Sequence, residues 1–351
     1  MRIPARELIT RLVGLQAQEQ RDPYVGLWSR LVDFDPSELE TLLVEREVVR
    51  MVVQRGTVHA ITAEDARVLR PLAQPILEQG LRNHRDYGPP LADADLKPVL
   101  KYATAVLREP HSTPKLRAAL AAEFPDLDAA ALAFACRNLL PFVQVPPRGL
   151  WSKGGQVVGT TLKAWTGHDV EKKPSVDAVM LRYLAAFGPA TVQDAATWSR
   201  YTALREVFER LRPQLVTYRD DDRREYFDVP DVPLPDADTP APVRILPQYD
   251  NLLLSHKDRS RFIAPASEAL GAIWLEHRGF VGSFLVDGML TGPWKIEDTK
   301  VTKTAPRTLT MTFTTSTRLK TADKAAVTAE AEQFLRFVDA DAKRQIRFQP
   351  A

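Results

Sequence analysis

Apolar and polar positions along the first two thirds of the chain repeat one order, in which helical spacing is followed by a pair of β-branched runs. Helical spacing covers Arg6–Leu15, and a second helix is expected to begin near Pro23. Asp35 and Pro36 give a start signal for a third helix, with Asp35 as its N-cap. Two β-branched runs around a short turn then predict a hairpin: Val48–Val53, Gln54-Arg55-Gly56 and Thr57–Thr62.

A second segment, from about Leu96 to Trp165, has the same order. Ser112 is expected to start one helix and Asp126 to cap another, and Phe142–Val145 reads as a strand that leads into a turn. We therefore expect a second copy of the helices-then-hairpin unit.

A third copy is expected from Ser175 to about Val229. Thr191 is its predicted helix cap, and the strands Leu215–Tyr218 and Tyr226–Val229 flank a polar turn. Three helices followed by a hairpin is the order of a winged-helix unit. Three copies in tandem favour nucleic acid as the partner.

The rest of the chain has a different rhythm. Residues 231–243 are rich in proline and acidic residues without periodicity, which predicts a linker. Expected strands and a helix follow: Val243–Ile245, Gly282–Val286, Leu290–Ile296, Thr308–Thr315 and the helix Thr321–Val338. Threonine alternates with other residues in the last of these strands, which predicts a sheet with one solvent-facing side.

The predicted fold is therefore α+β, with three tandem winged-helix units and a C-terminal α+β segment that together form a C-shaped DNA-binding cleft. The expected divisions are 1–90, 91–173, 174–230, a linker at 231–243, and 244–351.

Composition narrows the class of protein. Of 351 residues, 44% are hydrophobic and 26% charged, as in soluble globular proteins. No apolar run approaches the roughly 20 residues of a membrane span, and Met1–Arg6 lacks the features of a signal peptide, so we expect a cytoplasmic protein. The single cysteine, Cys136, lies in an apolar helical run and is expected to be buried. We expect no metal, no cofactor and a monomer.

Charge is unevenly distributed although the net charge is only +2. Residues 211–240 hold four basic and eight acidic groups, and residues 291–324 hold seven basic and three acidic groups. The basic groups of the second stretch are Lys295, Lys300, Lys303, Arg307, Arg318, Lys320 and Lys324. Such a strip would orient a polyanion, or it is simply a solvated loop.

Two glutamines near the N-terminus, Gln16 and Gln18, close the first helical stretch. Residues two apart do not share a helix face, so both amides can converge on one point only where the helix ends or loosens. Paired neutral amides suit the binding of a water molecule or a base edge. The alternative is two exposed glutamines at a helix end.

The stretch Arg-Leu-Val-Gly-Leu-Gln-Ala-Gln-x-x-x-Asp-Pro-Tyr resembles the glutamine-x-glutamine motif of the AlkZ-like DNA glycosylases. These are winged-helix proteins that excise N7-alkylated guanines and unhook interstrand crosslinks. The resemblance covers most of the chain and includes Arg55-Gly56-Thr57-Val58-His59, Trp198-Ser199, Leu246–Arg259 and Val286-Asp287-Gly288-x-x-x-Gly292-x-Trp294. The related YcaQ-like branch carries glutamine-x-aspartate, so the resemblance is to the AlkZ-like branch.

The resemblance implies a monofunctional glycosylase in which Gln16 and Gln18 hold a water near C1′. An N7-alkylguanine is already cationic and leaves as a neutral base, so no general acid is needed. An amide has no useful pKa, and catalysis would come from positioning and preorganised dipoles. The expected partner is double-stranded DNA with an alkylated guanine, including bulky adducts or crosslinks.

Candidate DNA-binding residues lie on the first hairpin. Arg55 and the hydroxyl of Thr57 are expected to contact phosphate, and His59 to line the cleft. The alternative is a satisfied strand histidine beside a solvated turn. Lys153, next to Gly154-Gly155 in the second hairpin, is a further candidate for a phosphate contact.

A dense polar cluster near residue 250 supplies the other candidates. Asn251 and His256 are expected to face the DNA, and Arg259 is added to the candidate DNA contacts. Asp250 and His256 are six residues apart with no second histidine nearby, which argues against a metal site or a catalytic triad. The alternative is an Asx-rich turn that ties the last segment to the winged helices.

Two rival functions remain at this stage. A non-catalytic winged-helix regulator would be expected to carry a basic recognition helix, whereas Ser37–Glu47 and Thr202–Leu211 are neutral or acidic. A repair scaffold that only binds lesions would differ from an enzyme in an excision assay.

Overall fold

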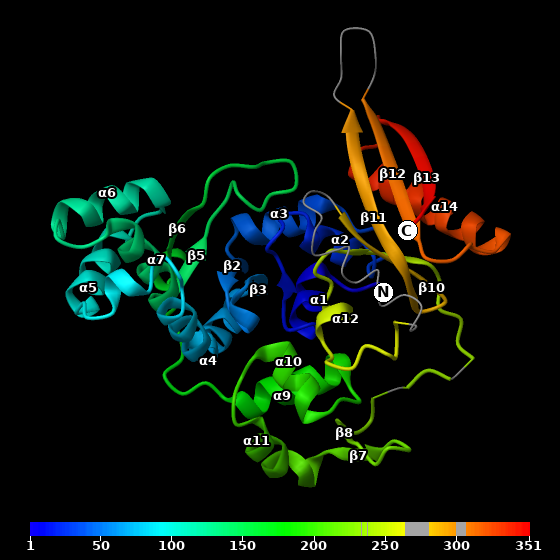
Figure 1. The fold of residues 1–351 in the computed structure, drawn as a ribbon, viewed down its shortest axis with the longest axis horizontal. Helices are drawn as coiled ribbons and strands as arrows, with labels where there is room; N and C mark the ends of the chain where they lie inside the picture. The colour runs from blue at the N-terminus through cyan, green and yellow to red at the C-terminus, as the bar shows by residue number, and fades with distance from the viewer. Residues whose placement is uncertain (233, 237, 264–280, 300–306) are drawn as a thin grey trace. The chain divides into compact units, whose positions relative to one another are not determined.

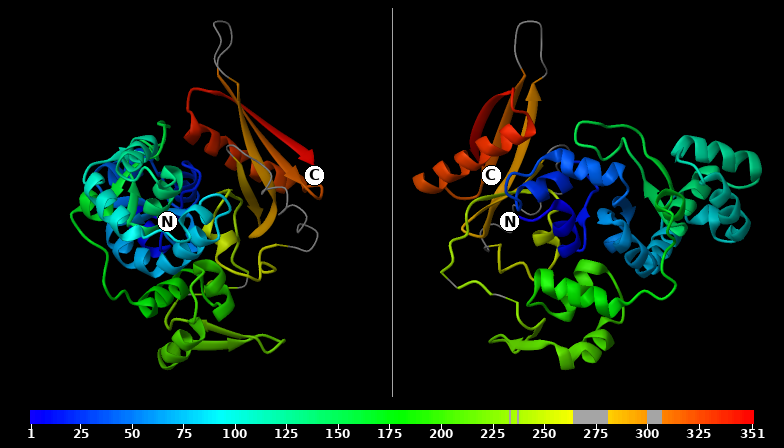
Figure 2. Two further views of the ribbon diagram at one scale, coloured as in Figure 1. Left: turned by 60° about the vertical axis from the view of Figure 1, so that its left-hand side comes forward. Right: turned by 180° about the vertical axis from the view of Figure 1, so that it is seen from behind.

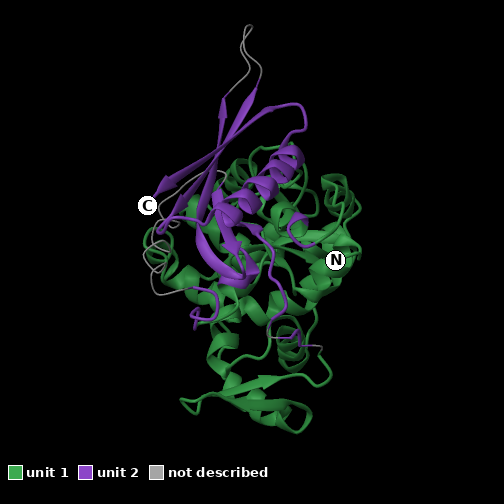
Figure 3. Ribbon diagram, turned by 90° about the vertical axis from the view of Figure 1, so that its right-hand side faces the viewer, with its two compact units in different colours: residues 1–27, 31–232, 254–257 green, residues 28–30, 233–253, 258–351 purple. Residues whose placement is uncertain are grey.

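The chain forms two compact units in the computed structural model, which describes residues 1–232, 234–236, 238–263, 281–299 and 307–351. The first unit holds residues 1–27, 31–232 and 254–257, and the second holds residues 28–30, 233–253 and 258–351 (Figure 3). The boundary near residue 232 falls at the start of the predicted linker. The expected divisions inside the first unit stay predictions.

One order of elements, α-β-α-α-β-β, opens the first unit. Its members are α1 (Ala5–Arg11), β1 (Leu15–Gln16), α2 (Asp22–Trp28), α3 (Pro36–Val44), β2 (Val48–Val52) and β3 (Val58–Thr62). The short strand β1 pairs with β3, and β3 pairs with β2, both antiparallel. This is the order of a winged-helix unit, in which the hairpin follows the third helix.

The same order recurs after the long helix α4 (Ala63–Arg82) and the turn η2 (Pro89–Leu91) (Figure 1). Its members are α5 (Leu96–Val106), β4 (His111–Ser112), α6 (Thr113–Glu123), α7 (Ala129–Leu139), β5 (Phe142–Gln144) and β6 (Val158–Thr161). Again the short strand, β4, pairs with the second strand of the hairpin, β6.

A third copy follows α8 (Leu162–Thr166). It consists of α9 (Val176–Phe187), α10 (Val192–Ser199), α11 (Leu204–Leu211), η3 (Arg212–Gln214), β7 (Val216–Arg219) and β8 (Glu225–Asp228). The short first strand is reduced to one bridge between Ala190 and Phe227 of β8. The predicted repeat of helices and hairpins is therefore present three times in the first unit.

The first two copies share one sheet. Its strand order is β1-β3-β2-β5-β6-β4, because β2 and β5 pair through Arg50 with Gln144 and Met51 with Val143. The sequence predicted two separate hairpins. Strands about 90 residues apart in the sequence leave no local signal that they pair, so only the structure reveals that the two hairpins form one continuous sheet.

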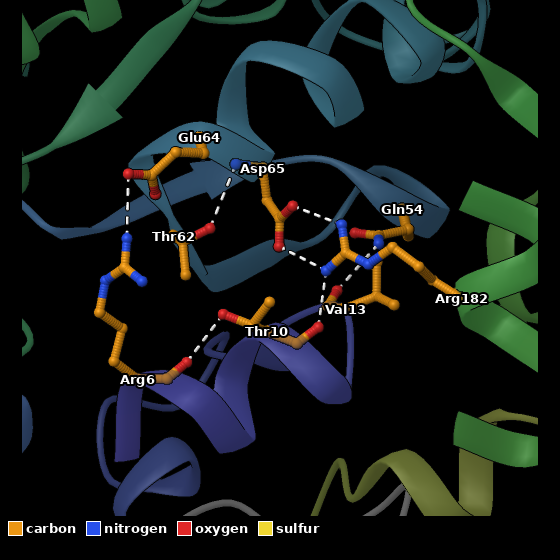
Figure 4. Close-up of polar contacts among 8 residues, drawn as sticks. All are labelled: Arg6, Thr10, Val13, Gln54, Thr62, Glu64, Asp65 and Arg182. Carbon is orange, nitrogen blue, oxygen red and sulfur yellow. Dashed lines mark hydrogen bonds and ion pairs between the residues drawn. The ribbon is translucent and has the colours of Figure 1, made fainter. Parts of the chain in front are cut away.

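An ion pair between a half-buried arginine and a nearly buried aspartate attaches the third copy to the first (Figure 4). Arg182 of α9 donates to both carboxylate oxygens of Asp65, at 2.5 and 2.8 Å, and to the carbonyl oxygen of Thr10 at 2.6 Å. The Thr62 hydroxyl caps α4 by accepting from the Asp65 amide. One guanidinium thus joins α9, the start of α4 and the end of α1.

The second unit is built on a five-stranded sheet with the order β13-β12-β11-β10-β9. The strands are β9 (Arg244–Pro247), β10 (Val281–Val286), β11 (Met289–Thr299), β12 (Thr308–Thr315) and β13 (Lys343–Pro350). The helix α14 (Thr321–Val338) lies along the sheet in both views of Figure 2, with Phe334 against Trp294 at 5.3 Å between ring centres. The short helix α12 (Asn251–Leu254) follows β9.

Several start signals predicted from the sequence are confirmed. Asp35 accepts from the Ser37 amide with Pro36 at N1, Ser112 caps α6, and Thr191 forms a capping box with Asp194. Cys136 is fully buried, and burial raises the pKa of its thiol to about 12. Across the described ranges, no helix has both the length and the apolar character needed to cross a membrane.

Two local predictions are wrong, and one strand was not predicted. The first helix ends at Arg11 rather than Leu15, because Gly14 takes a φ of +96° and approaches Ile61 so closely that a Cβ would collide. Asp128, not Asp126, caps α7 by accepting from the amides of Ala130 and Ala131. The charged strand β13 was not expected at all.

The predicted solvent-facing side of β12 is also wrong. Thr310 and Thr312 are 6% and 5% exposed. The parallel strand β13 pairs along the whole of β12, and Thr310 donates to Gln345 of β13 at 3.3 Å. Alternation of threonine with apolar residues marks the two faces of a strand, but it does not reveal what covers the polar face.

Candidate active site

The segment that carries Gln16 and Gln18 is a short strand followed by a bend rather than the end of a helix. Gln16 pairs with His59, and the Ala17 amide continues the pairing by donating to the Val58 carbonyl at 2.7 Å. The strand ends at Gln16, whose side chain is buried, and Gln18 lies two residues further on in a bend, where its side chain is exposed. The two glutamines therefore follow the first helix on a strand and a bend rather than closing the helix, and their convergence on one point stays a prediction.

Two buried side chains fix the backbone of this segment. Arg50 donates to the Ala17 carbonyl at 3.0 Å, and Gln54 donates to the Val13 carbonyl at 3.2 Å. Both are almost completely buried, and burial, helped by nearby Arg148, lowers the pKa of Arg50 to about 10. Arg50 stays cationic at neutral pH and holds the residue between the two glutamines.

The Arg55 guanidinium contacts the side chain of Gln16. Its Nη2 donates to Gln16 Oε1 at 2.8 Å and to His59 Nε2 at 3.0 Å, and its Nη1 donates to the Trp198 carbonyl at 2.6 Å. Burial and the neighbouring Arg200 lower the pKa of Arg55 to about 10. Both terminal nitrogens therefore contact protein groups, although the sequence predicted a phosphate contact, which stays untested.

His59 is held as a neutral ring. Its Nδ1 is 2.9 Å from the Thr57 carbonyl, which can only accept, so Nδ1 carries the proton and Nε2 accepts from Arg55. Burial and the charge of Arg55 lower the pKa of His59 to about 3. The imidazole consequently does not take up a second proton near neutral pH.

The other candidates in the first unit lie around this segment. Thr57 donates its hydroxyl to the Gln54 carbonyl, and Lys153 is exposed in the long loop between β5 and β6 (Figure 1). The base of that loop is fixed at Gly149, whose amide donates to Gln20 and whose carbonyl accepts from the Tyr24 hydroxyl at 2.8 Å. The loop that carries Lys153 thus starts beside the residues that follow Gln18.

The polar cluster near residue 250 is divided between the units. His256 belongs to the first unit, is 3% exposed and donates from Nε2 to the Phe187 carbonyl at 2.9 Å. Asn251 is buried in the second unit, where Arg259 is exposed. Asp250 accepts both terminal nitrogens of Arg30 at 2.8 and 2.9 Å. The predicted roles of these residues toward DNA stay predictions.

Part of the predicted basic strip is neutralised by local ion pairs. Lys295 lies 2.8 Å from Glu297, and Arg307 contacts Asp298 at 2.7 Å. Lys300 and Lys303 fall outside the described residues. Within the described residues, no group of three or more histidine, cysteine or acidic side chains is placed to hold a metal ion.

Sequence reasoning missed Arg50, Gln54 and the carbonyl of Trp198. Arg50 left a signal, because it is a charge inside the apolar strand Val48–Val52 and such a charge needs a specific partner. The Trp198 carbonyl is a backbone atom 143 residues from Arg55 and leaves no signal in the sequence.

The fold has a solved counterpart. The structure of Streptomyces sahachiroi DNA glycosylase AlkZ matches with a TM-score of 0.74 and 19% sequence identity, covering 99% of this chain and 94% of that chain. A search of curated protein sequences finds no match. The shared architecture places this chain in the α+β class to which that enzyme's structure belongs.

The family model described as DNA glycosylase AlkZ-like matches residues 9–337. The chain therefore belongs to the AlkZ-like DNA glycosylase family and is a DNA glycosylase that binds DNA.

Proposed function

We propose that this glycosylase hydrolyses the N-glycosidic bond of N7-alkylguanine in duplex DNA, crosslinked adducts included, with a water held by Gln16 and Gln18. The observation that carries the proposal is the segment Gln16–Gln18 beside β3, which is held by the buried side chains of Arg50 and Gln54 and by the half-buried Arg55. Rigid placement of neutral dipoles is what catalysis by positioning requires.

The chemistry around the amides limits the substrate. In the proposed step the water oxygen bonds to C1′ while the C1′–N9 bond breaks. The bonding pair goes to N9 and neutralises the cationic base, and a water proton passes to solvent. Because His59 stays neutral and Arg55 stays charged near pH 7, neither supplies a proton to the leaving group. This environment suits a base that leaves without protonation.

Contacts with the DNA backbone are proposed for Thr57, Lys153 and Arg259, of which the last two are exposed. Asn251 and His256 are retained as candidates facing the DNA, and we propose that the protein acts as a monomer in the cytoplasm. A non-catalytic regulator is the rival that a direct excision assay excludes.

The test is single-turnover excision from two matched duplexes, one with N7-methylguanine and one with uracil. We expect release of N7-methylguanine and no release of uracil. Gln16→Ala and Gln18→Ala should each slow excision roughly 100-fold or more, because loss of one positioned donor costs about 2.7–4 kcal/mol of barrier. Gln193→Ala, which alters an exposed glutamine on α10, is the matched control. Full activity of the Gln16→Ala/Gln18→Ala double variant would refute the mechanism.

A further inference from the structure

We propose that Arg55 is a positioning residue that fixes the direction of the Gln16 amide during excision. On this proposal its guanidinium does not bind a DNA phosphate. This inference rests on the proposed function of Gln16. Its starting point is the 2.8 Å hydrogen bond from Arg55 Nη2 to Gln16 Oε1.

The direction of the Gln16 amide follows from the chemistry of its partner. A guanidinium has five N–H donors and no acceptor, so the Gln16 atom in contact with it is the oxygen. The amide nitrogen of Gln16 then points away from Arg55. No described residue accepts a hydrogen bond from this nitrogen, and the nitrogen is not fully enclosed by protein atoms. Gln16 therefore offers an N–H donor to the site.

Gln18 supplies the complementary group. Its Oε1 is 3.5 Å from the Val58 amide, at the limit of a hydrogen bond, and an amide oxygen has two lone pairs. A water between the glutamines can thus accept from Gln16 and donate to Gln18. Its second lone pair remains available for C1′.

The position of Arg55 is fixed by three elements. Its backbone has a φ of +57° in the turn η1 (Gln54–Gly56) of the first hairpin. The Trp198 carbonyl at the end of α10 and the neutral His59 ring of β3 each accept one further hydrogen bond from its guanidinium. A planar guanidinium can contact all three acceptors at once, which a lysine ammonium at this position cannot reproduce.

Two substitutions of Arg55 separate positioning from phosphate binding. Arg55→Lys keeps the charge and loses the planar fork, whereas Arg55→Asn removes the charge and tolerates a positive φ. Arg46 provides the matched control, since it has a φ of +70° and donates to the Trp165 carbonyl at 2.9 Å but is exposed. Arg46→Lys and Arg46→Asn should leave excision unchanged.

We expect both Arg55 variants to slow single-turnover excision of N7-methylguanine about 100-fold, as expected for a misplaced catalytic group, with little change in DNA affinity. The log–log slope of affinity against salt should not change. Loss of a phosphate contact would instead make that slope shallower by about 0.9 and leave excision fast once DNA is bound. That result, or wild-type excision in Arg55→Lys, would overturn the proposal.

A double substitution separates the positioning role of Arg55 from the proposed role of Gln16 itself. If Arg55 acts through Gln16, Gln16→Ala/Arg55→Lys should be no slower than Gln16→Ala alone. Multiplying effects would show that Arg55 acts independently of Gln16. Full activity of Gln16→Ala would instead refute the role of Gln16 itself. Near-ultraviolet circular dichroism of each variant verifies that it is folded. If Arg55→Asn does not fold, the excision rate of Arg55→Lys decides the proposal.

Discussion

At the residue scale, the glutamine pair is set in an environment with almost no acid–base chemistry near neutrality. Arg55, which donates to Gln16, has a pKa of about 10, and His59, whose ring accepts from Arg55, has a pKa of about 3. We therefore predict that the single-turnover excision rate of N7-methylguanine varies little between about pH 6 and 8. A bell-shaped profile centred near neutrality would assign proton transfer to a residue such as His59, His256 or Asp250.

The buried neutral His59 also predicts a dependence of stability on pH. Its folded-state pKa lies below the unfolded value of about 6.5, so below pH 6.5 the unfolded state binds a proton that the folded state does not. The free energy of unfolding should fall as the pH drops from about 6.5 toward 3, by at most about 1.4 kcal/mol per pH unit.

Thermal unfolding between pH 6.5 and 5 measures this effect above the range in which most carboxyl groups titrate. The fall in Tm should be shallower in His59→Gln and unchanged in His168→Gln, which alters an exposed histidine. Equal slopes in wild type and His59→Gln would show that His59 accepts a proton in the folded state.

At the element scale, the contact between α9 and the start of α4 depends on Arg182 and Asp65. Arg182→Met should lower the free energy of unfolding by about 2 kcal/mol, because it leaves the nearly buried Asp65 without its charged donor. Urea unfolding provides the measurement. Arg210→Met is the control, since its bidentate pair with Asp177 is more exposed and should change stability little. An equal loss of unfolding free energy in Arg182→Met and Arg210→Met would mean that the burial of Asp65 adds nothing to the stability that its ion pair provides.

Which elements the sequence could reveal depends on where their determinants lie. Helix starts at Asp35, Ser112 and Thr191 are set by a cap and its next three residues, and they were predicted. The end of α1 depends on the contact of Gly14 with Ile61, which is remote in sequence. Strand β13 is mostly polar or charged and mostly exposed, and its parallel pairing with β12 produces no apolar pattern.

The candidate site shows the same limit. Gln16 and Gln18 were identified because the motif around them resembles a known family, and the turn at Arg55 was predicted from local residues. The inward direction of the Arg55 side chain was not predicted. It depends on the neutral ring of His59 and on the Trp198 carbonyl, which come together only in the folded unit.

At the scale of the whole molecule, DNA affinity should come mainly from phosphate neutralisation, because the third helices of the winged-helix units carry few basic side chains. We predict that binding to undamaged duplex weakens linearly with salt on a log–log plot. Fluorescence anisotropy at several salt concentrations tests this. A flat response, or a strong preference for one undamaged sequence, would favour sequence-specific recognition.

The pairing of β2 with β5 has a consequence for the separate expression of winged-helix units. A fragment that ends near residue 90 would lack β5 and would leave the backbone of β2 around Arg50 and Met51 as an unprotected sheet edge. Such an edge recruits strands from other molecules, so the fragment should self-associate. The same applies to a fragment that begins near residue 91, whose β5 would be bare. The first two winged-helix copies, which both lie in the first unit, therefore form a single cooperative folding element, and gene fusions or truncations should keep them together.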